Sequence, residues 1–316
     1  MSKDHMDGMN RRGMLECMGW AGTGALYTLA GGVLSSVSLD AALAAPRGRV
    51  HPKAKPFTFL QISDSHVGFN KAANPDARAT YREAIAKVNA LAVKPDFILH
   101  TGDITHLSKD VEFDDADMIL KEAGVPVFHI PGEHDWLDDT PGKAYLARFG
   151  KGTHGSGWTS FDHSGVHFVA LNNVASFHPG GLGHLGDDQL AWLRNDLAHL
   201  SASTPVVVFA HIPMWTIYAE WGWGTDDATQ ALSYLKRFGS VTVLNGHIHQ
   251  IIQKVEGNIS FHTARATAYP QPAPGAAPSP GPMTVPTEQL HSFLGIRTAT
   301  VVPGTAQIAL IDEALV

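Results

Sequence analysis

Apolar runs of strand length alternate with amphipathic stretches of helix length from residue 57 to about residue 245, and this alternation limits the possible folds more than any other feature. Such a pattern predicts buried strands joined by helices that cover the sheet, which is an α/β fold. The expected strands are 57–63, 96–101, 126–130, 166–172, 205–210 and 241–245, and the expected helices are 76–92, 109–123, 187–200 and 227–238.

After residue 250 the pattern changes to short strands without helices. RTATVV and AQIALI, joined through Pro303 and Gly304, predict a C-terminal β-hairpin over 297–311. The segment 269–286 contains seven prolines in eighteen residues, which favours an extended polyproline conformation without a core of its own. Because a strand pair follows it, we expect this segment to lie over a single domain, 46–316.

Acidic residues and histidines follow the ends of the predicted strands. They are Asp64, His66, Asp103, the run Glu133, His134 and Asp135, then His211, His247 and His249. Loops that leave the carboxyl ends of strands in an open α/β sheet converge on one crevice. We expect Asp64 and His66 to grip one ion together, since an extended backbone points alternate side chains to the same side.

The ligand types define the metals that such a site would take. Asp103 has two carboxylate oxygens and can bridge two cations, while His211, His247 and His249 offer neutral imidazoles. The only cysteine is Cys17, near the N-terminus, so thiolate ligands are not expected. Imidazole and carboxylate suit Zn, Mn or Fe. Two such ions would lower the pKa of a shared water and neutralise a phosphoryl group during in-line displacement.

The order DSH, GD, GEHD, H and GHIH between residues 57 and 263 resembles that of the calcineurin-like metallophosphoesterase superfamily. The resemblance implies a four-layer αββα sandwich with two mixed β-sheets and a metal-bridging hydroxide as nucleophile. The spacing of the motifs looks most like the bacterial class III cyclic nucleotide phosphodiesterase branch. The implied first metal ligands are Asp64, His66, Asp103 and His249; the implied second metal ligands are Asp103, Glu133, His211 and His247.

His134, which follows Glu133 in the chain, would be the catalytic histidine by the same resemblance. A protonated His134 would donate a proton to the leaving oxygen as general acid. Asp135 could orient or charge its ring. One position departs from the family pattern, because Glu133 stands where the family has asparagine. A third carboxylate should favour a more highly charged ion such as Fe(III), or weaken the Lewis acidity of a divalent pair.

Residues that could contact the substrate are less sharply defined. His106 follows Asp103 closely enough to face the substrate, and Trp136 lies beside the catalytic histidine. Trp215 and Trp221 follow His211 and could form an aromatic lip, although aromatic residues at such spacing usually pack in the core. Lys71 and Arg265 are candidates for reaching a phosphate.

The N-terminus predicts export. Paired Arg11 and Arg12, an uncharged stretch over 17–39 and an Ala-x-Ala site at 42–44 resemble a bacterial twin-arginine signal. We therefore expect residues 1–45 to be a signal peptide and the protein to be periplasmic or secreted, with no stable membrane span once the signal is removed. The alternative is that the uncharged stretch anchors the chain in a membrane.

The leading hypothesis is an exported phosphoesterase with two metal ions that cleaves a small phosphodiester or phosphomonoester. The net charge of -7 argues against nucleic acid as a partner. One alternative is a catalytically silent metal-binding interaction module. Another is a hydrolase that uses the same centre on a non-phosphorus ester. The sequence leaves the oligomeric state open.

Overall fold

The computed structural model describes residues 25–30, 33–38, 55–176, 181–305 and 308–316. The chain divides into two units at Lys53. In the first unit, β1 (Ala25–Ala30) pairs antiparallel with β2 (Val33–Ser38). The predicted signal sequence and its cleavage site lie mostly outside the described residues. In the described part of the chain, no helix is both long enough and apolar enough to cross a bilayer.

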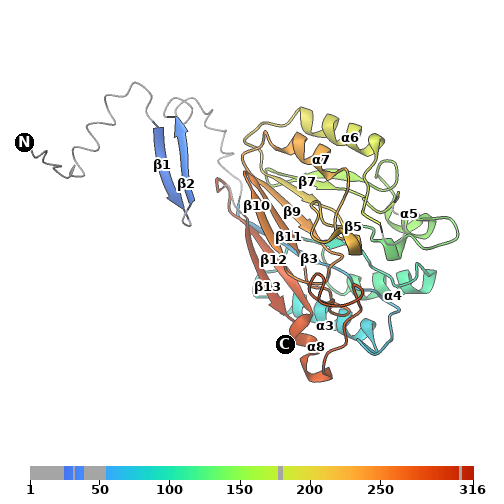
Figure 1. The fold of residues 1–316 in the computed structure, drawn as a ribbon. Coiled ribbons are helices and arrows are strands. Elements are labelled where there is room, and N and C mark those ends of the chain that lie inside the picture. The colour runs from blue at the N-terminus through green and yellow to red at the C-terminus, as the bar shows by residue number, and fades with distance from the viewer. Residues whose placement is uncertain (1–24, 31–32, 39–54, 177–180, 306–307) are drawn as a thin grey trace, which may run out of the picture. The chain divides into compact units, whose positions relative to one another are not determined.

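The second unit contains two mixed β-sheets flanked by helices (Figure 1). The larger sheet has the order β10-β11-β9-β8-β7-β6, with β7, β8, β9 and β11 parallel and the two edge strands antiparallel to their neighbours. Its strands are β6 (Thr159–His163), β7 (Val166–Ala170), β8 (Val206–Phe209), β9 (Val241–Asn245), β10 (Gln253–Glu256) and β11 (Ile259–Thr263).

The smaller sheet has the order β13-β12-β3-β4-β5. In it β3, β4 and β5 are parallel, and β12 runs antiparallel to both β3 and β13. Its strands are β3 (Phe57–Ile62), β4 (Phe97–Thr101), β5 (Val127–Ile130), β12 (Gly295–Val301) and β13 (Ala309–Ala314). The predicted α/β sandwich is therefore confirmed, and the last strand begins at Ala309 rather than at Ala306.

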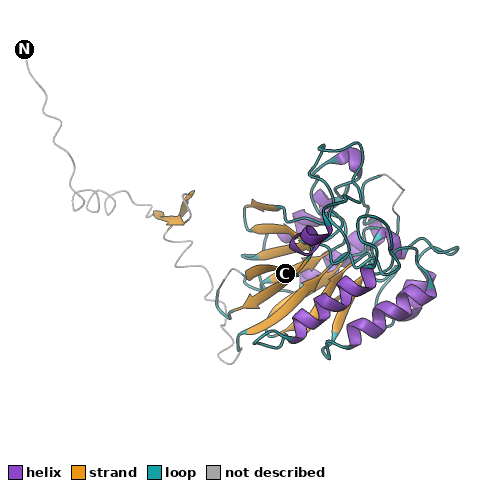
Figure 2. Ribbon diagram, turned by 90° about the horizontal axis from the view of Figure 1, so that it is seen from below, coloured by secondary structure: helices purple, strands orange, loops and turns teal. Residues whose placement is uncertain are grey.

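The helices lie outside the sheets (Figure 2). Those of the smaller sheet bury a stripe of apolar residues, as α4 does with Phe113, Ala116 and Ile119. The helices of the second unit are α3 (Ala77–Asn89), α4 (Asp110–Lys121), α5 (Lys143–Phe149), α6 (Asp187–Ala198), α7 (Ala228–Leu235) and α8 (Leu290–Phe293). All six predicted strands and all four predicted helices are present. Each predicted helix ends two or three residues earlier than expected. Apolar residues beyond the helix end, such as Phe238, still pack in the core, so the apolar pattern continues past the helix.

Aromatic side chains fill the space between the two sheets. Phe59 of β3 stacks on Phe97 of β4 at 5.4 Å between ring centroids, and its ring meets Phe168 of β7 edge-on at 5.3 Å. Phe59 and Phe168 are fully buried. Truncating one of these rings to alanine would cost about 3–5 kcal/mol of stability. The two sheets are thus held face to face by one apolar layer.

A buried polar network ties the carboxyl ends of the strands together. The guanidinium of Arg297 in β12 donates to Gln61 Oε1 at 3.0 Å and to the carbonyl of Thr263 at 2.8 Å. Gln61 Nε2 in turn donates to Thr101 Oγ1 and to the carbonyl of Asn245, both at 3.1 Å. Asp312 balances the charge of Arg297 at 2.8 Å. Because Thr101, Asn245 and Thr263 are the last residues of β4, β9 and β11, the network fixes where the loops of the two sheets begin.

The Pro-rich segment lies against this domain. Gln250 Nε2 donates to the carbonyl of Pro272 at 3.0 Å, and a Cβ on Gly275 would lie 3.4 Å from the hydroxyl oxygen of Tyr218.

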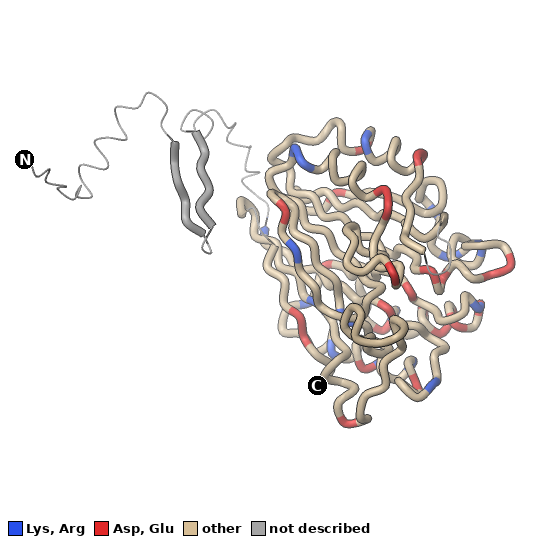
Figure 3. Tube along the Cα trace, viewed as in Figure 1, with Lys and Arg blue, Asp and Glu red and all other residues tan. Residues whose placement is uncertain are grey.

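Acidic and basic positions are interspersed along the described chain (Figure 3).

Candidate metal centre

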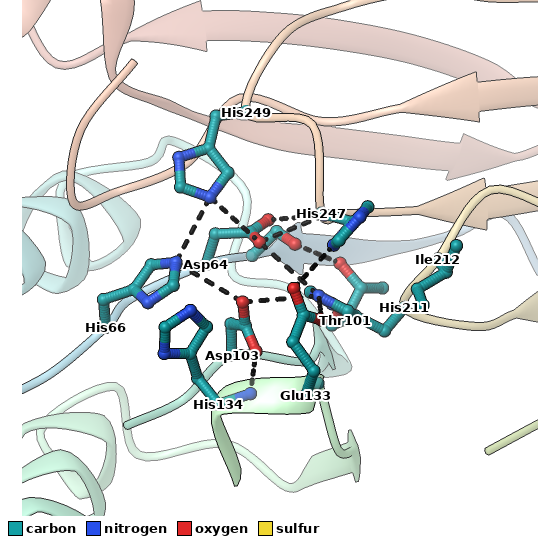
Figure 4. Close-up of polar contacts among 12 residues, drawn as sticks. Asp64, His66, Thr101, Asp103, Glu133, His134, His211, Ile212, His247 and His249 are labelled. Atoms are coloured by element: carbon teal, nitrogen blue, oxygen red, sulfur yellow. Dashed lines mark hydrogen bonds and ion pairs between the residues drawn. The ribbon is translucent and has the colours of Figure 1, made fainter. Parts of the chain in front are cut away.

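The strand ends bring the predicted metal ligands together (Figure 4). The loop after β3 carries Asp64 and His66, and the loop after β4 carries Asp103. Glu133 lies in a 3-10 turn, η1 (Glu133–Asp135), directly after β5. The larger sheet supplies His211 after β8, and His247 and His249 after β9. We call these seven residues the Asp/His cluster.

The backbone of the cluster is unusual. Positive φ angles occur at Asp64 (53°), His66 (39°), Asp103 (52°), His247 (71°) and His249 (52°). Non-glycine residues rarely adopt this left-handed region, and such residues concentrate at functional sites. Asp64 and His66 therefore converge through a left-handed turn, so the expectation that strand alternation places them together is wrong.

Three glycines let the loops approach closely. A Cβ on Gly132 would lie 2.1 Å from Asp103 Oδ1, and a Cβ on Gly246 would lie 2.1 Å from Ser63 Oγ. A Cβ on Gly102 would lie 2.5 Å from His211 Nδ1. The glycine of each GD, GEHD and GHIH motif is thus required by packing against the loop that carries another ligand.

A first ligand group consists of Asp64, His66 and His249. His249 Nε2 lies 3.3 Å from Asp64 Oδ1 and 3.2 Å from His66 Nε2. Two nitrogens about 2.1 Å from one tetrahedral ion would be about 3.4 Å apart, so this spacing suits ligands of a common ion. All three side chains are buried.

A second ligand group consists of Glu133, His211 and His247. Glu133 Oε2 lies 2.9 Å from His211 Nε2, and Glu133 Oε1 lies 2.9 Å from His247 Nδ1. Asp103 stands between the two groups, because its Oδ2 is 3.4 Å from both His66 Nε2 and His211 Nε2. This is the position required of a bridging carboxylate.

Backbone carbonyls set the orientation of two rings. Nδ1 of His211 donates to the carbonyl of Thr101 at 2.7 Å, and Nδ1 of His249 donates to the carbonyl of Tyr269 at 2.6 Å. A hydrogen on Nδ1 leaves Nε2 with a lone pair in the neutral ring, and this arrangement is typical of metal-binding histidines. In both rings Nε2 is the atom that faces the cluster.

The contacts between Glu133, His211 and His247 need a shared hydrogen or ion. If His211 is neutral with its hydrogen on Nδ1, Glu133 Oε2 and His211 Nε2 are two acceptors 2.9 Å apart. His247 Nδ1 lies 2.9 Å from Glu133 Oε1, and His247 Nε2 has no hydrogen-bond partner among the described residues. Burial lowers the pKa of His211, but Asp103 and Glu133 outweigh it and raise this pKa well above its ordinary value. A proton or a metal ion must therefore lie between these atoms, and the donor set fits two metal ions.

His134 follows Glu133 and points into the same site (Figure 4). Its Nδ1 donates to the carbonyl of His106 at 2.7 Å, so Nε2 is the nitrogen left for proton transfer. Burial lowers the pKa of His134, whereas Asp103 and Glu133 raise it, and the net shift is upward. The ring of His106 stacks on that of His134 at 5.0 Å, which places His106 beside the cluster, and its contact with the substrate stays a prediction.

Asp135 does not orient this ring, so that half of the sequence-based expectation is wrong, whereas the alternative that it charges the ring agrees with its contribution to the raised pKa of His134. Its carboxylate accepts hydrogen bonds from the backbone N–H groups of Ile104, Thr105 and Gly132 at 3.0, 2.8 and 3.0 Å. It therefore joins the loop after β4 to the turn after β5, the two segments that carry Asp103 and Glu133. The orienting group for the His134 ring is the carbonyl of His106 instead.

The predicted tryptophans make packing contacts. The ring of Trp136 packs against Tyr145 at 5.9 Å, and that of Trp215 packs against Phe261 at 5.2 Å. Trp221 lies 5.0 Å from both Tyr218 and Trp223. These contacts favour the alternative in which the aromatic residues belong to the core.

Lys71 and Arg265, the two predicted phosphate-binding side chains, lie in different surroundings. The guanidinium of Arg265 donates to the carbonyl of Ser292, whereas Lys71 is exposed.

Tyr269 is a residue of the site that sequence reasoning missed. This residue opens the Pro-rich segment, twenty positions after His249, and no motif marks it. In the folded chain it is 5% exposed, and its hydroxyl lies 3.2 Å from His66 Nε2.

The profile of the calcineurin-like phosphoesterase family matches residues 57–251, more than half of the chain and all five motifs. The sequence is 27% identical over 227 residues to the serine/threonine-protein phosphatase CPPED1 of Danio rerio, covering 62% of this chain and 71% of that protein. It is 24% identical over 230 residues to the probable cyclic nucleotide phosphodiesterase RPA0124 of Rhodopseudomonas palustris, covering 67% and 78%. A dimetal phosphatase from Danio rerio shares the fold, with a TM-score of 0.61 at 14% identity over 82% of this chain and 96% of that one.

Proposed function

The chain belongs to the calcineurin-like phosphoesterase family, and on that premise we propose that it hydrolyses a small phosphomonoester or phosphodiester with two metal ions bound in the Asp/His cluster. The observation that carries this proposal is the position of Asp103, whose Oδ2 lies 3.4 Å from a histidine of each ligand group. A carboxylate shared in this way supports a two-ion site of the kind that phosphoryl transfer uses.

His134 and Asp135 have different roles in the proposed reaction. When bound, two cations would activate a water molecule and neutralise charge on the phosphoryl group. The water would release one proton to solvent, and its oxygen would join phosphorus as the bond to the leaving oxygen breaks. His134 supplies the proton that the leaving oxygen needs, from Nε2, because its Nδ1–H is held by the carbonyl of His106. Asp135 keeps the loop of Asp103 in register with the turn of Glu133.

Iron, manganese and zinc are the metals that we propose for this site. Nitrogen and carboxylate ligands suit all three. Glu133, Asp64 and Asp103 together bring three carboxylates, which favours a more highly charged ion such as Fe(III) in the second ligand group.

The test is hydrolysis by protein loaded in turn with Mn, Zn or Fe, with p-nitrophenyl phosphate compared against bis(p-nitrophenyl) phosphate. We expect activity that is lost on chelation and restored by metal. Changing His134→Asn should lower kcat by about 100-fold or more and leave the metal content unchanged. The loss should be smaller for a nitrophenol, which leaves without a proton, than for an alcohol. A metal-loaded protein that cleaves neither ester, nor any of a panel of mono-, di- and cyclic phosphates, would refute the proposal.

We also propose that the protein is exported, with residues 1–45 as its signal. The support is the paired Arg11 and Arg12, the uncharged stretch that follows them and the Ala-x-Ala site. Fractionation of cells that express the full chain should recover a shortened protein outside the cytoplasm. The double change Arg11→Lys, Arg12→Lys should retain the uncleaved chain inside. Equal export of both chains would argue against a twin-arginine signal.

A further inference from the structure

Tyr269 contacts the first ligand group at both of its ends. Its backbone carbonyl accepts the Nδ1–H of His249 at 2.6 Å, and its phenol oxygen lies 3.2 Å from Nε2 of His66. The ring itself packs against both imidazoles, with centroids 4.8 Å from His66 and 4.6 Å from His249. A residue outside every metal-ligand motif thus reaches the atom of His66 that faces the cluster.

The segment that carries Tyr269 is held in place by its neighbours. The N–H of Thr267 donates to the carbonyl of Ser63 at 3.1 Å, and Asn74 Nδ2 donates to the carbonyl of Ala268 at 2.6 Å. The ring of Phe69 packs on that of Tyr269 at 4.3 Å between centroids. The phenol is therefore positioned before any ligand binds, which lowers the entropic cost of using it.

Metal binding would change the hydrogen bonding of this phenol. The 3.2 Å contact between the phenol and His66 is a hydrogen bond only while His66 Nε2 can offer a lone pair or donate a hydrogen. An ion held by His66 and His249 would take that lone pair, because the Nε2 atoms of the two rings face each other at 3.2 Å. The phenol O–H is then left without its partner in a buried site, at a cost that a new acceptor would remove.

Building on the proposed function, we propose that Tyr269 is a substrate-binding residue whose hydroxyl donates a hydrogen bond to a phosphoryl oxygen held at the first ligand group. The phosphoryl group is the anionic acceptor that the proposed reaction brings to the cluster. The hydroxyl would thus distinguish bound phosphate from bound water through a charge-assisted hydrogen bond.

The experiment measures the binding of inorganic phosphate to Mn-loaded protein by calorimetry, with metal content by elemental analysis. Tyr269→Phe removes the hydroxyl and retains the ring and the carbonyl that holds His249. We expect phosphate to bind about tenfold more weakly to this variant, as befits the loss of one hydrogen bond to a charged group. The metal content should match that of the parent. Tyr234→Phe, which removes a hydroxyl that accepts a hydrogen bond from Gln230 Nε2 on α7, is the matched control and should bind like the parent.

Two results would overturn the inference. Equal phosphate affinity in the parent and in Tyr269→Phe would show that the hydroxyl does not contact the anion. Loss of an ion from Tyr269→Phe, or loss of a visible charge-transfer band when the protein is loaded with iron, would make the phenol a metal ligand instead.

The outcome is separable from that of the proposed function. A parent that binds phosphate more tightly than the variant but hydrolyses no ester would refute the enzyme activity and leave the role of Tyr269 standing. An active parent whose Tyr269→Phe variant binds phosphate equally well would support the enzyme activity and refute the role of Tyr269.

Discussion

Two groups of histidine and carboxylate in this molecule share their composition but differ in their hydrogen bonding. In β7, His167 uses both ring nitrogens, with Nδ1 at 2.8 Å from Asp162 and Nε2 at 2.9 Å from Asp196. In the Asp/His cluster, His211 Nε2 and His247 Nδ1 each lie 2.9 Å from a Glu133 oxygen without a well-aligned hydrogen bond, and His247 Nε2 has no partner among the described residues. The first group is complete as it stands, whereas the second needs a proton or a metal ion between its facing atoms. Unsatisfied atoms that face one another, more than residue types, therefore mark the metal centre.

The largest expected effect follows from removing the residue that the two ligand groups share. Changing Asp103→Asn removes the charge from the carboxylate that lies 3.4 Å from both His66 Nε2 and His211 Nε2. We expect bound metal to fall below two ions per chain and kcat/KM to fall by more than about 100-fold, since even residues that only support metal ligands cost 10–100-fold. Asp188→Asn, an exposed change in the first turn of α6, is the control. Parent-like metal content in Asp103→Asn would contradict a shared ligand.

A second change tests whether the glycines are required by packing. In Gly132→Ala the new Cβ would lie 2.1 Å from Asp103 Oδ1, so the two loops must move apart. We expect a loss of about 100-fold in kcat, because displacements near 1 Å can cost that much. Gly239→Ala provides the matched control, since its nearest neighbouring atom is the carbonyl oxygen of Ala202 at 3.7 Å. Equal activity of the two variants would show that the close approach is unimportant.

Glu133→Asn should change which metal binds more than whether metal binds. The substitution keeps an oxygen ligand and removes one of three carboxylates, so the second ligand group should shift from iron toward Mn or Zn. Elemental analysis after purification from mixed-metal medium measures this preference, with the exposed Glu288→Gln as control. An unchanged metal ratio would remove the role assigned to Glu133.

The smallest effect is expected at His167, which should alter stability and leave metal content unchanged. Burial lowers the pKa of His167, but Asp196 and Asp162 outweigh it and raise the pKa above the ordinary value of 6.5. The ion pairs therefore stabilise the fold fully below pH about 6.5, and this contribution is lost as the pH rises through the folded-state pKa. His167→Asn should cost about 2 kcal/mol in acid solution and progressively less above that range. Denaturant unfolding across pH 5.5 to 9, at about half-unit steps, gives the comparison. A pH-independent difference between the two proteins would contradict the protonated state of His167.

The sequence predicted most of what this comparison requires. The periodicity located the strands, and the position of aspartate and histidine at strand ends predicted the residues that meet in the folded chain, because parallel strands bring their carboxyl ends to one edge. It failed where the cause is not local. The left-handed backbone at Asp64 and His66, the bonds of Asp135 to the amides of a distant loop and the approach of Tyr269 all depend on tertiary packing. No spacing rule in the chain encodes those contacts.

The most direct test of the two-ion centre is a crystal structure of the Mn-loaded protein with anomalous diffraction recorded at the manganese edge. The account predicts two peaks about 3.5 to 4 Å apart, one within the first ligand group and one within the second, with Asp103 between them. A single peak, or two peaks that do not share Asp103, would contradict it.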